Sequence, residues 1–446
     1  MELKIPDKVK FIIDQLGNNG FEAFAVGGCV RDAVLGRIPN DWDITTSAHP
    51  EDIMKCFKHT IPTGIKHGTV TVMLDRDPFE VTTYRIDGEY SDNRHPDSVT
   101  FTSDLTEDLS RRDFTINSMA YNTSSGIIDP FGGLADLKRS LIRTVGNPND
   151  RYNEDALRMI RAIRFSCQLN FQIDEAAFSS IKLNSELIKN VSAERIRDEF
   201  SKILLSEHPS KGIENLRIGG LLQYFFPEAL LMVGFDQKNP HHDKDVYYHT
   251  LSVLDNTEPN LVLRLSALLH DIAKPLTFSI DAKGIGHFYS HNVKGVEVSE
   301  QLLKRLRFDN MTIKKVNALI FDHMSRYENL KDSSVKKIIT RVGTDNLFEL
   351  FDLQVADIKG SAPPFDYSGI EYLKNRCEQI LEQKHPLTVK DLALKGEDII
   401  KLGYKPGKLI GDTLNYLLEK VLEAPELNTK AALEEIAIDF ISTKNN

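Results

Sequence analysis

Residues 27–46 read GGCVRDAVLGRIPNDWDITT, and this stretch decides the fold of the first part of the chain. Asp41 and Asp43 are expected on a strand that continues through residues 44–46. Residues two apart on a strand point to the same face, so the two carboxylates can share a pair of Mg²⁺ ions. An isolated DxD more often marks an exposed strand edge, and the metal site therefore depends on the residues before it.

Those preceding residues form the motif GGxVRD, at positions 27–32. Gly27 and Gly28 allow the backbone to approach phosphate oxygens closely, although a strand-to-helix turn is the simpler explanation for two adjacent glycines. Arg31 can add charge-assisted hydrogen bonds to a phosphate. Together, GGxVRD and DxD predict nucleotidyl transfer, in which two metal ions activate the attacking hydroxyl and neutralise the leaving pyrophosphate.

The stretch 27–46 resembles the polymerase β-like nucleotidyltransferases, in particular the bacterial class II tRNA nucleotidyltransferases (CCA-adding enzymes) and their poly(A) polymerase relatives. The resemblance implies an α+β fold with a polymerase β-like head, Mg²⁺ as cofactor, and tRNA, ATP and CTP as partners. It implies that Glu80, in FEVTTYR, is a third acidic residue of the metal site, with a solvated strand glutamate as the alternative. In RRDFTIN, residues 111–117, it implies that Arg112 approaches the triphosphate.

Residues 85–101, RIDGEYSDNRHPDSVTF, are rich in turn formers and charges. They resemble the flexible loop of the same family, which is associated with the switch to adenine addition. The loop and the basic-acidic step at Arg85 and Asp87 therefore favour addition of CCA or A over addition of CC alone.

The segment EDALRMIRAIRF, residues 154–165, predicts a helix with Asp155, Arg158 and Arg161 along one face. Aspartate accepts from an exocyclic amino group and arginine donates to ring acceptors, so Asp155 and Arg158 can act as a Watson–Crick partner for C or A. An ordinary i,i+3 salt bridge is the alternative. The segment resembles the family's base-selection motif, and Arg161 and Arg164 are assigned to nucleotide phosphate binding or helix anchoring.

Histidines gather between about residues 225 and 360. The dipeptide His270-Asp271 lies in the apolar segment LSALLHDIAKP, which is expected to be helical. Unless the dipeptide binds a ligand, this helix would bury two polar groups without partners. The pattern resembles an HD-superfamily metal site whose residues are His249, His270, Asp271 and Asp357, with His291 and His323 as possible further ligands and His287 as a competitor of His291. The resemblance implies a transition-metal ion and either a phosphohydrolase activity or a structural HD domain.

The sequence predicts a head at 1–148, a helical neck at 149–224, an HD-type helical domain at 225–360 and a helical tail at 361–446. GSAPPFDYSG, residues 360–369, is expected to be a hinge before the tail. SAERIR, residues 192–197, resembles a neck motif that braces the base-reading helix, with Ser192 as its N-cap. In the tail, Lys401, Lys405 and Lys408 flank a turn and can touch RNA phosphates, with a solvated turn as the alternative.

The 446 residues carry a formal charge of −10, which excludes bulk electrostatic attraction as the means of holding RNA. Local basic clusters must hold it instead. The sequence has no apolar run of the length a membrane span needs and no secretory signal at its N-terminus, so a cytoplasmic location is expected. The cysteines, at 29, 56, 167 and 377, lack paired spacing, which argues against a disulfide framework and a zinc cluster.

The sequence therefore predicts a template-independent nucleotidyltransferase that adds CCA, or part of it, to tRNA 3′ ends. An A-adding enzyme or a poly(A) polymerase of the same family stays open, because the same pocket chemistry serves all three products. An HD phosphohydrolase whose head only binds nucleotide or RNA is the alternative from another class. The paired carboxylates on one strand face argue against a head that only binds.

Overall fold

The computed structural model describes residues 2–88, 98–238, 244–325 and 329–444 of the chain. The chain forms two compact units, residues 1–227 and 228–446. Their boundary lies close to the predicted boundary between the neck and the HD-type domain. The finer division into head, neck, HD-type domain and tail remains a prediction.

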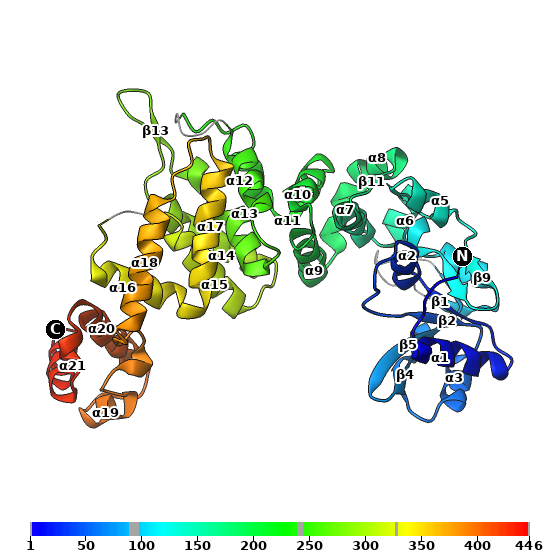
Figure 1. The fold of residues 1–446 in the computed structure, drawn as a ribbon, viewed down its shortest axis with the longest axis horizontal. Helices are drawn as coiled ribbons and strands as arrows, with labels where there is room; N and C mark the ends of the chain where they lie inside the picture. Colours follow the sequence, from blue (N-terminus) through cyan, green and yellow to red (C-terminus); the bar gives the residue numbers. More distant parts are fainter. Residues whose placement is uncertain (1, 89–97, 239–243, 326–328, 445–446) are drawn as a thin grey trace. The chain divides into compact units, whose positions relative to one another are not determined.

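A seven-stranded mixed sheet forms the head of the first unit (Figure 1). Strand β2 runs parallel to β5 on one side and antiparallel to β1 on the other. All three residues of β2 and all four of β1 are buried, so these strands form the centre of the head. In spatial order the strands are β3 (Thr60–Gly64), β4 (Thr69–Leu74), β5 (Asp77–Thr83), β2 (Ile44–Thr46), β1 (Ala23–Val26), β8 (Ala120–Asn122) and β9 (Gly126–Ile128).

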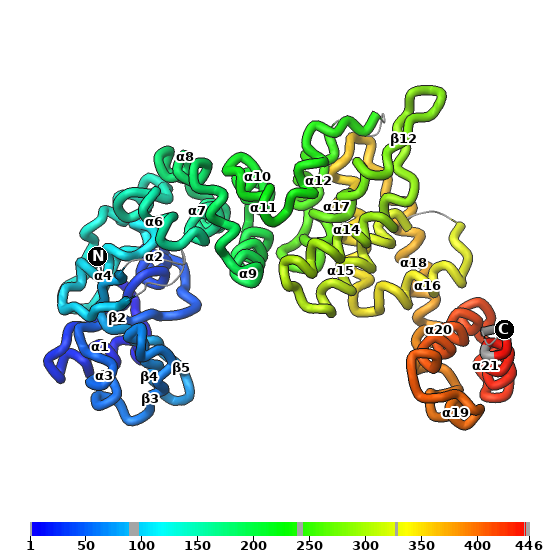
Figure 2. The backbone as a smooth tube through the Cα atoms, turned by 180° about the vertical axis from the view of Figure 1, so that it is seen from behind, coloured from blue at the N-terminus to red at the C-terminus, as the bar shows by residue number. Residues whose placement is uncertain are grey.

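Helices α1 and α3 pack against the sheet (Figure 2). The buried residues of α1 are Val9, Ile12, Ile13 and Leu16, which recur at helical spacing and give the helix one apolar face. The helices of the first unit are α1 (Asp7–Asn18), α2 (Gly28–Val34), α3 (Pro50–Cys56), α4 (Leu105–Ser110), α5 (Gly133–Lys138), α6 (Pro148–Glu154), α7 (Leu157–Leu169), α8 (Glu175–Asn184), α9 (Ala193–Leu204), α10 (Pro209–Ile218) and α11 (Leu222–Phe225). Short strands pair outside the sheet, β6 (Arg85–Asp87) with β7 (Val99–Phe101) and β10 (Leu141–Ile142) with β11 (Gln172–Ile173).

The second unit is helical apart from one short hairpin in its described part, β12 (Ser279–Ile280) with β13 (Gly286–His287). Helices α12, α13, α15 and α17 pack against one another (Figure 1). The predicted hinge at 360–369 connects α17 to α18, and the predicted turn in the tail connects α19 to α20. The helices are α12 (Val246–Asp255), α13 (Leu261–Leu269), α14 (His291–Arg305), α15 (Asn310–Asp322), α16 (Asp332–Val342), α17 (Leu347–Gly360), α18 (Ser368–Glu382), α19 (Gly396–Lys401), α20 (Lys408–Glu423) and α21 (Lys430–Lys444).

The prediction that Asp41 and Asp43 lie on a strand is wrong by a few residues. Strand β2 begins at Ile44, and both aspartates lie in the segment directly before it. On the β1 side the ladder already reaches Asp43, whose carbonyl oxygen accepts from the Val26 N–H at 3.0 Å. On the β5 side pairing starts only with Ile44 and Val81.

The predicted continuous helix through residues 154–165 is also wrong, because the chain breaks at Asp155. Helix α6 ends at Glu154, Asp155 has φ −141° and ψ 103°, and α7 begins at Leu157. The Asp155 carboxylate accepts from the Leu157 N–H at 3.1 Å, so it replaces a backbone partner at the start of the new helix. Asp155 therefore does not share a helix face with Arg158 and Arg161.

Among the helices of the described residues, none combines the length and the apolar character that a membrane span requires. The cysteine thiols are free, in agreement with their spacing.

Candidate functional site

A cavity of about 970 Å³ lies in the first unit, between the head and the helices α7 and α9. Most of the predicted nucleotide and metal residues line it. Glu80, Asp155 and Arg158 are described by the structure but do not lie on its wall. The predicted residues that line it are Gly27, Gly28, Arg31, Asp41, Asp43, Arg112, Arg161 and Arg164.

Gly27 stands at the turn between β1 and α2. Its φ of +85° is a conformation that L side chains rarely adopt, and a Cβ at this position would lie 3.0 Å from Nη1 of Arg112. Its N–H donates to the Met119 carbonyl oxygen at 3.1 Å. The glycine is therefore needed both for the turn and for the space that Arg112 occupies.

We expect Gly27→Ala to reduce nucleotide addition more than tenfold in kcat/KM and to destabilise the chain by about 1–2 kcal/mol, because alanine is strained at positive φ and displaces Arg112. Steady-state kinetics and urea unfolding measure the two effects. Gly17→Ala is the matched control, since Gly17 lies in α1 and its added Cβ would meet nothing within 4 Å. Equal activity of the two variants would contradict the assignment.

The acidic side of the cavity contains Asp41 and Asp43. Part of the Asp43 side chain reaches solvent. The protein around its carboxyl group nevertheless removes enough water to raise the pKa of Asp43. The Arg112 guanidinium opposes this shift, and the Asp41 carboxylate adds to it. The two carboxylates thus repel each other across a space that a divalent cation with oxygen ligands would fill. Val81 pairs with Ile44, so continuing this parallel register by one residue places Glu80 beside Asp43, although Glu80 does not line the cavity.

The basic side of the cavity is organised around the ring of Phe165. The guanidinium carbons of Arg31, Arg161 and Arg164 lie 5.0, 5.5 and 3.9 Å from its centroid. Stacking on an aromatic face restrains three like charges that would otherwise separate. The arrangement gives this wall a fixed concentration of positive charge.

Each of these arginines also has a carboxylate partner. Arg31 binds Asp32 through two nitrogens at 2.8 and 3.0 Å. Arg161 donates to Asp113 at 2.6 and 2.9 Å, and Arg164 donates to Glu199 at 2.5 Å. Burial would raise the pKa of Asp113, but the charge of Arg161 prevails and keeps it well below its usual range. These pairs support the anchoring role that was predicted as one possibility for Arg161 and Arg164.

Asp155 and Arg158 are not paired with each other. Asp155 accepts from Arg195 at 2.8 and 3.2 Å, while Arg158 donates to Glu154 at 2.6 Å and to the Arg111 carbonyl oxygen at 3.0 Å. The prediction of a shared hydrogen-bonding edge is therefore not met in this structure. Arg195 comes from the segment predicted to brace the base-reading helix; Ser192 is at its N-cap position but makes no side-chain capping bond.

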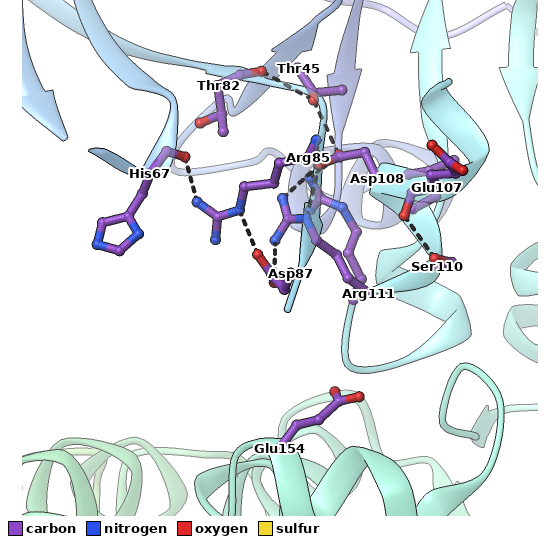
Figure 3. A network of polar contacts seen from close by, with 12 residues as sticks. Thr45, His67, Thr82, Arg85, Asp87, Glu107, Asp108, Ser110, Arg111 and Glu154 are labelled. Carbon is purple, nitrogen blue, oxygen red and sulfur yellow. Dashed lines mark hydrogen bonds and ion pairs between the residues drawn. The ribbon is translucent and has the colours of Figure 1, made fainter. Parts of the chain in front are cut away.

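Asp108 connects the base of the predicted flexible loop to the cavity (Figure 3). This carboxylate is fully buried and accepts from the Arg85 N–H, the Thr45 hydroxyl and the guanidinium groups of Arg111 and Arg112. Burial would raise the pKa of Asp108, but the two arginines outweigh it and lower the pKa. The predicted basic-acidic step is an ion pair, with Arg85 Nε 3.1 Å from Asp87 Oδ1. Residues 89–97 of the loop lie outside the described residues.

Sequence reasoning missed the acidic residues that hold the arginines, namely Asp32, Asp108, Asp113 and Glu199. Asp32 and Asp113 stand inside the quoted motifs, and their alternation with arginine was a usable signal. Asp108 lies three and four residues before Arg111 and Arg112, so its spacing was also a usable signal. Glu199 gave no such signal, because its pairing with Arg164 joins two separate helices, α9 and α7.

The second unit contains a cluster of histidines and aspartates from five helices or helix ends. His249 lies in α12, His291 begins α14 and Asp357 lies in α17, while His270 and His323 follow directly after α13 and α15. The prediction that His270-Asp271 lies inside a helix is therefore off by one or two residues, because α13 ends at Leu269. All six predicted residues are buried. His287 does not compete for the site, since its ring binds Asp281 at 3.0 Å; His241 and His242 lie outside the described residues.

Asp271 is the centre of this cluster. Its Oδ2 lies 3.5 Å from Nε2 of His249 and 3.1 Å from Nε2 of His270, and its Oδ1 lies 3.5 Å from Nε2 of His291 and 4.0 Å from Nε2 of His323. Asp357 Oδ1 lies 3.1 Å from Nε2 of His249. The atoms form two groups that could each hold an ion, and Asp271 belongs to both.

The charges in the cluster fit a cation. Burial would lower the pKa of His270, but the Asp271 and Asp357 carboxylates raise it to about 10. Burial lowers the pKa of His323 to about 3, with His270 and His291 acting in the same direction. Nε2 of His270 and both oxygens of Asp271 are buried and make no well-aligned hydrogen bond within the described residues, although Lys274 Nζ lies 2.8 Å from Asp271 Oδ2. A transition metal requires neutral imidazoles and carboxylate oxygens as its ligands. The low pKa of His323 meets this requirement, whereas His270 must give up the proton that its raised pKa retains before it can bind the ion.

Comparison with known proteins gives matches along most of the chain. A model described as "Poly A polymerase head domain" matches residues 23–143, one described as "Probable RNA and SrmB- binding site of polymerase A" matches residues 170–231, and one described as "tRNA nucleotidyltransferase domain 2 putative" matches residues 288–437. The CCA-adding enzyme of Ligilactobacillus salivarius is 33% identical over 446 residues, which cover 99% of this chain and 98% of the relative. That of Lactobacillus helveticus is 35% identical over 440 residues, 98% of each chain.

Solved structures agree. The Bacillus stearothermophilus CCA-adding enzyme in complex with CTP is 27% identical, with a TM-score of 0.70 and 99% of each chain covered. The Thermotoga maritima CCA-adding enzyme complexed with tRNA_CCA is 19% identical with a TM-score of 0.56, a likeness of fold alone. The predicted α+β fold, with a polymerase β-like head and a helical body, is confirmed. On its similarity over nearly the full length of these relatives, the chain belongs to the family of CCA-adding enzymes.

Proposed function

We propose that this chain adds CCA to the 3′ end of tRNA from CTP and ATP. The observation that carries the proposal is the full-length relation to CCA-adding enzymes together with a cavity that has two aspartates on one side and a fixed arginine cluster on the other. Incubation with labelled CTP and ATP and a tRNA lacking its 3′ end tests it. Incorporation of both labels is expected, and incorporation of ATP alone would favour the A-adding or poly(A) alternative.

The reaction joins the oxygen of the tRNA 3′-hydroxyl to the α-phosphorus of the nucleotide as the bond to the β-phosphate oxygen breaks and pyrophosphate leaves. Arg31, Arg112, Arg161 and Arg164 supply positive charge for the triphosphate on the cavity wall. Their carboxylate and aromatic partners hold them in place before substrate arrives, so little reorganisation is needed during transfer.

Enzymes of this family use divalent metal ions, and we propose Mg²⁺ at Asp41 and Asp43, with Glu80 beside them. The donor set of hard carboxylate oxygens fits this ion. Bound Mg²⁺ would activate the attacking hydroxyl and neutralise the leaving pyrophosphate. The cytoplasmic location expected from the sequence stays a prediction.

Base choice is proposed to depend on Asp155 and Arg158. In this structure Asp155 forms an ion pair with Arg195, and Arg158 forms one with Glu154. To read a base edge, the two residues must exchange these ion pairs for contacts with the nucleotide.

We expect Asp155→Ala and Arg158→Ala to relax the choice among the four nucleotides more than they slow transfer, because neither residue touches a reacting atom. Each lost base contact should reduce discrimination by about tenfold or more. Competition among all four triphosphates, read out by sequencing the products, measures the change. Arg195→Ala serves as the comparison. This variant removes the ion-pair partner of Asp155 and keeps Asp155 itself, so it should choose among the four nucleotides as the wild type does. A slower but equally selective Asp155→Ala variant would contradict the base-reading role.

A second activity is favoured by the cluster around Asp271. We propose that this cluster binds a transition metal and supports hydrolysis of a phosphate ester, in which water supplies the oxygen that replaces the leaving alcohol on phosphorus. The support is the convergence of five buried candidate ligands, with Asp357 beside His249, and the buried Nε2 of His270, which makes no hydrogen bond within the described residues. Asp271 can serve one ion or bridge two, since its two oxygens face different histidines. Conversion of a 2′,3′-cyclic nucleotide into a nucleoside monophosphate, or release of phosphate from a monophosphate, in the presence of Mn²⁺ tests the activity.

A further inference from the structure

A hydrogen-bonded series of four side chains crosses from the head to helix α7 along the wall of the cavity in the first unit. It leads from Arg31 in α2 through Asn117 and Asp113 to Arg161 in α7, and all four residues line that cavity. Asn117 ends the short 3₁₀ helix Thr115–Asn117 and is only 6% exposed. It is the one member of the series that carries no charge.

The amide group of Asn117 joins a cation to an anion. Its oxygen accepts from Nη1 of Arg31 at 2.8 Å, and its nitrogen donates to Oδ1 of Asp113 at 3.1 Å. The other oxygen of Asp113 accepts from Nε and Nη2 of Arg161 at 2.9 and 2.6 Å. A guanidinium group only donates and a carboxylate only accepts, so the two neighbours determine which end of the amide faces each of them.

Asn117 fixes Arg31 in a way that its other partners do not. Asp32 is the next residue of α2 and moves with Arg31, and the ring of Phe165 contacts the flat face of the guanidinium group. The bond to Asn117 instead ties Arg31 to a different element of the head. It also directs the guanidinium group within its own plane, which stacking on a ring leaves free.

The neutral amide leaves the positive charge of this wall intact. In the described part of the chain, the contacts of Arg31 with Asp32 and Asn117 use one N–H of each guanidinium nitrogen. The second N–H groups of Nη1 and Nη2 therefore remain available to an anion. A carboxylate at position 117 would add a second negative charge beside Asp113 and would neutralise Arg31, which already pairs with Asp32.

We infer that Asn117 is a positioning residue for the triphosphate of the incoming nucleotide, a role that rests on the proposed nucleotide addition. Asn117 sets the separation of Arg31, which belongs to the head, from Arg161, which belongs to α7. Donors that are held in place before an anion arrives lose little freedom on binding it. The gain in affinity should therefore grow with the number of phosphate groups that reach both arginines.

The test compares the wild-type chain with Asn117→Ala and Asn117→Asp by isothermal titration calorimetry, without divalent metal. The probes are CTP and CMP, which share the base and the first phosphate, so the ratio of their affinities measures recognition of the other two phosphates. Any binding to the second unit is common to all the proteins compared, because the substitutions lie in the first unit. Urea unfolding of each preparation establishes that the titrated protein is folded.

Asn122→Ala is the matched control. Asn122 is another buried asparagine of the head, and its amide nitrogen donates to the Ala23 carbonyl oxygen at 3.3 Å while its amide oxygen accepts from the Ser125 N–H at 2.7 Å. It does not line the cavity of the first unit. The control therefore removes a buried amide of the same kind without touching the arginines.

The wild type should bind CTP more tightly than CMP. Asn117→Ala should weaken the binding of CTP by about tenfold, the effect expected of one hydrogen bond to a charged group, and that of CMP by less than about threefold. Asn117→Asp has nearly the same shape as the wild-type residue but should weaken CTP binding further, because it adds a negative charge. Asn122→Ala should bind both nucleotides as the wild type does.

Three results would overturn the inference: equal affinity of the wild type for CTP and CMP, an equal loss of both affinities in Asn117→Ala, or wild-type CTP affinity in Asn117→Asp. Incorporation of labelled CTP into tRNA by the wild type separates these results from failure of the proposed function. If the wild type incorporates the label, only the role of Asn117 is wrong. A wild type that incorporates no nucleotide would overturn the proposed function, and the role of Asn117 with it.

Discussion

Asp43→Asn is expected to abolish nucleotide addition while the fold and tRNA binding persist. The substitution keeps the shape of the side chain and removes one of the two carboxylates that face the proposed metal position. Loss of metal-assisted charge stabilisation is worth several kcal/mol, on the order of a thousandfold in rate. The measurement is incorporation of labelled CTP at saturating tRNA, with circular dichroism and a tRNA binding curve on the same preparation.

Asp14→Asn is the matched control, because Asp14 is an exposed carboxylate of α1 in the same unit. It should retain wild-type incorporation. Addition by Asp43→Asn within a few fold of wild type would exclude Asp43 as a metal ligand and move the reaction centre elsewhere in the cavity.

The double variant His270→Ala, Asp271→Ala is expected to remove metal binding and phosphate-ester hydrolysis from the second unit and to leave nucleotide addition nearly unchanged. Two ligands disappear at once, including the one that belongs to both possible ion positions. In the wild type, Mn²⁺ at a hundred times its dissociation constant for the cluster should stabilise the chain by about 2.7 kcal/mol beyond any effect of the head site, and the variant should lose this additional gain. Thermal unfolding with and without Mn²⁺ and metal analysis of the protein measure the effect.

His67→Ala is the control for this experiment, since His67 is an exposed histidine that belongs to the first unit and not to the cluster. It should keep both the metal and the stabilisation. A double variant that is stabilised by Mn²⁺ as much as the wild type would show that the cluster is a buried polar network and not a metal site.

Much of the head could be predicted from sequence because its signals are local. Two glycines, an arginine and two aspartates stand within one short stretch, and the turn that Gly27 makes follows from its lack of a Cβ. The break at Asp155 could not be predicted in this way. The segment 154–165 contains neither glycine nor proline, and the extended backbone at Asp155 is stabilised by an arginine 40 residues further along the chain.

The two candidate sites differ in how far their residues could be predicted from the sequence. The six residues around Asp271 were predicted from their resemblance to an HD-superfamily metal site, and in the structure they lie close together. The acidic partners of Arg161 and Arg164 were not predicted, since aspartate and glutamate are common and only the fold shows that Asp113 and Glu199 meet these arginines. The separation of Asp155 from Arg158 could not be predicted either. Arg195, in α9, pairs with Asp155, and Glu154, at the end of α6, pairs with Arg158.

The sequence of the product formed on tRNA tests the account most directly. Three tRNA substrates are needed: one ending at the nucleotide before the CCA end, one extended by a single C and one extended by CC. With CTP and ATP both present, the account predicts that all three end in CCA and that addition then stops. A run of adenines on any of them, addition of A to the unextended tRNA, or termination at CC would contradict it.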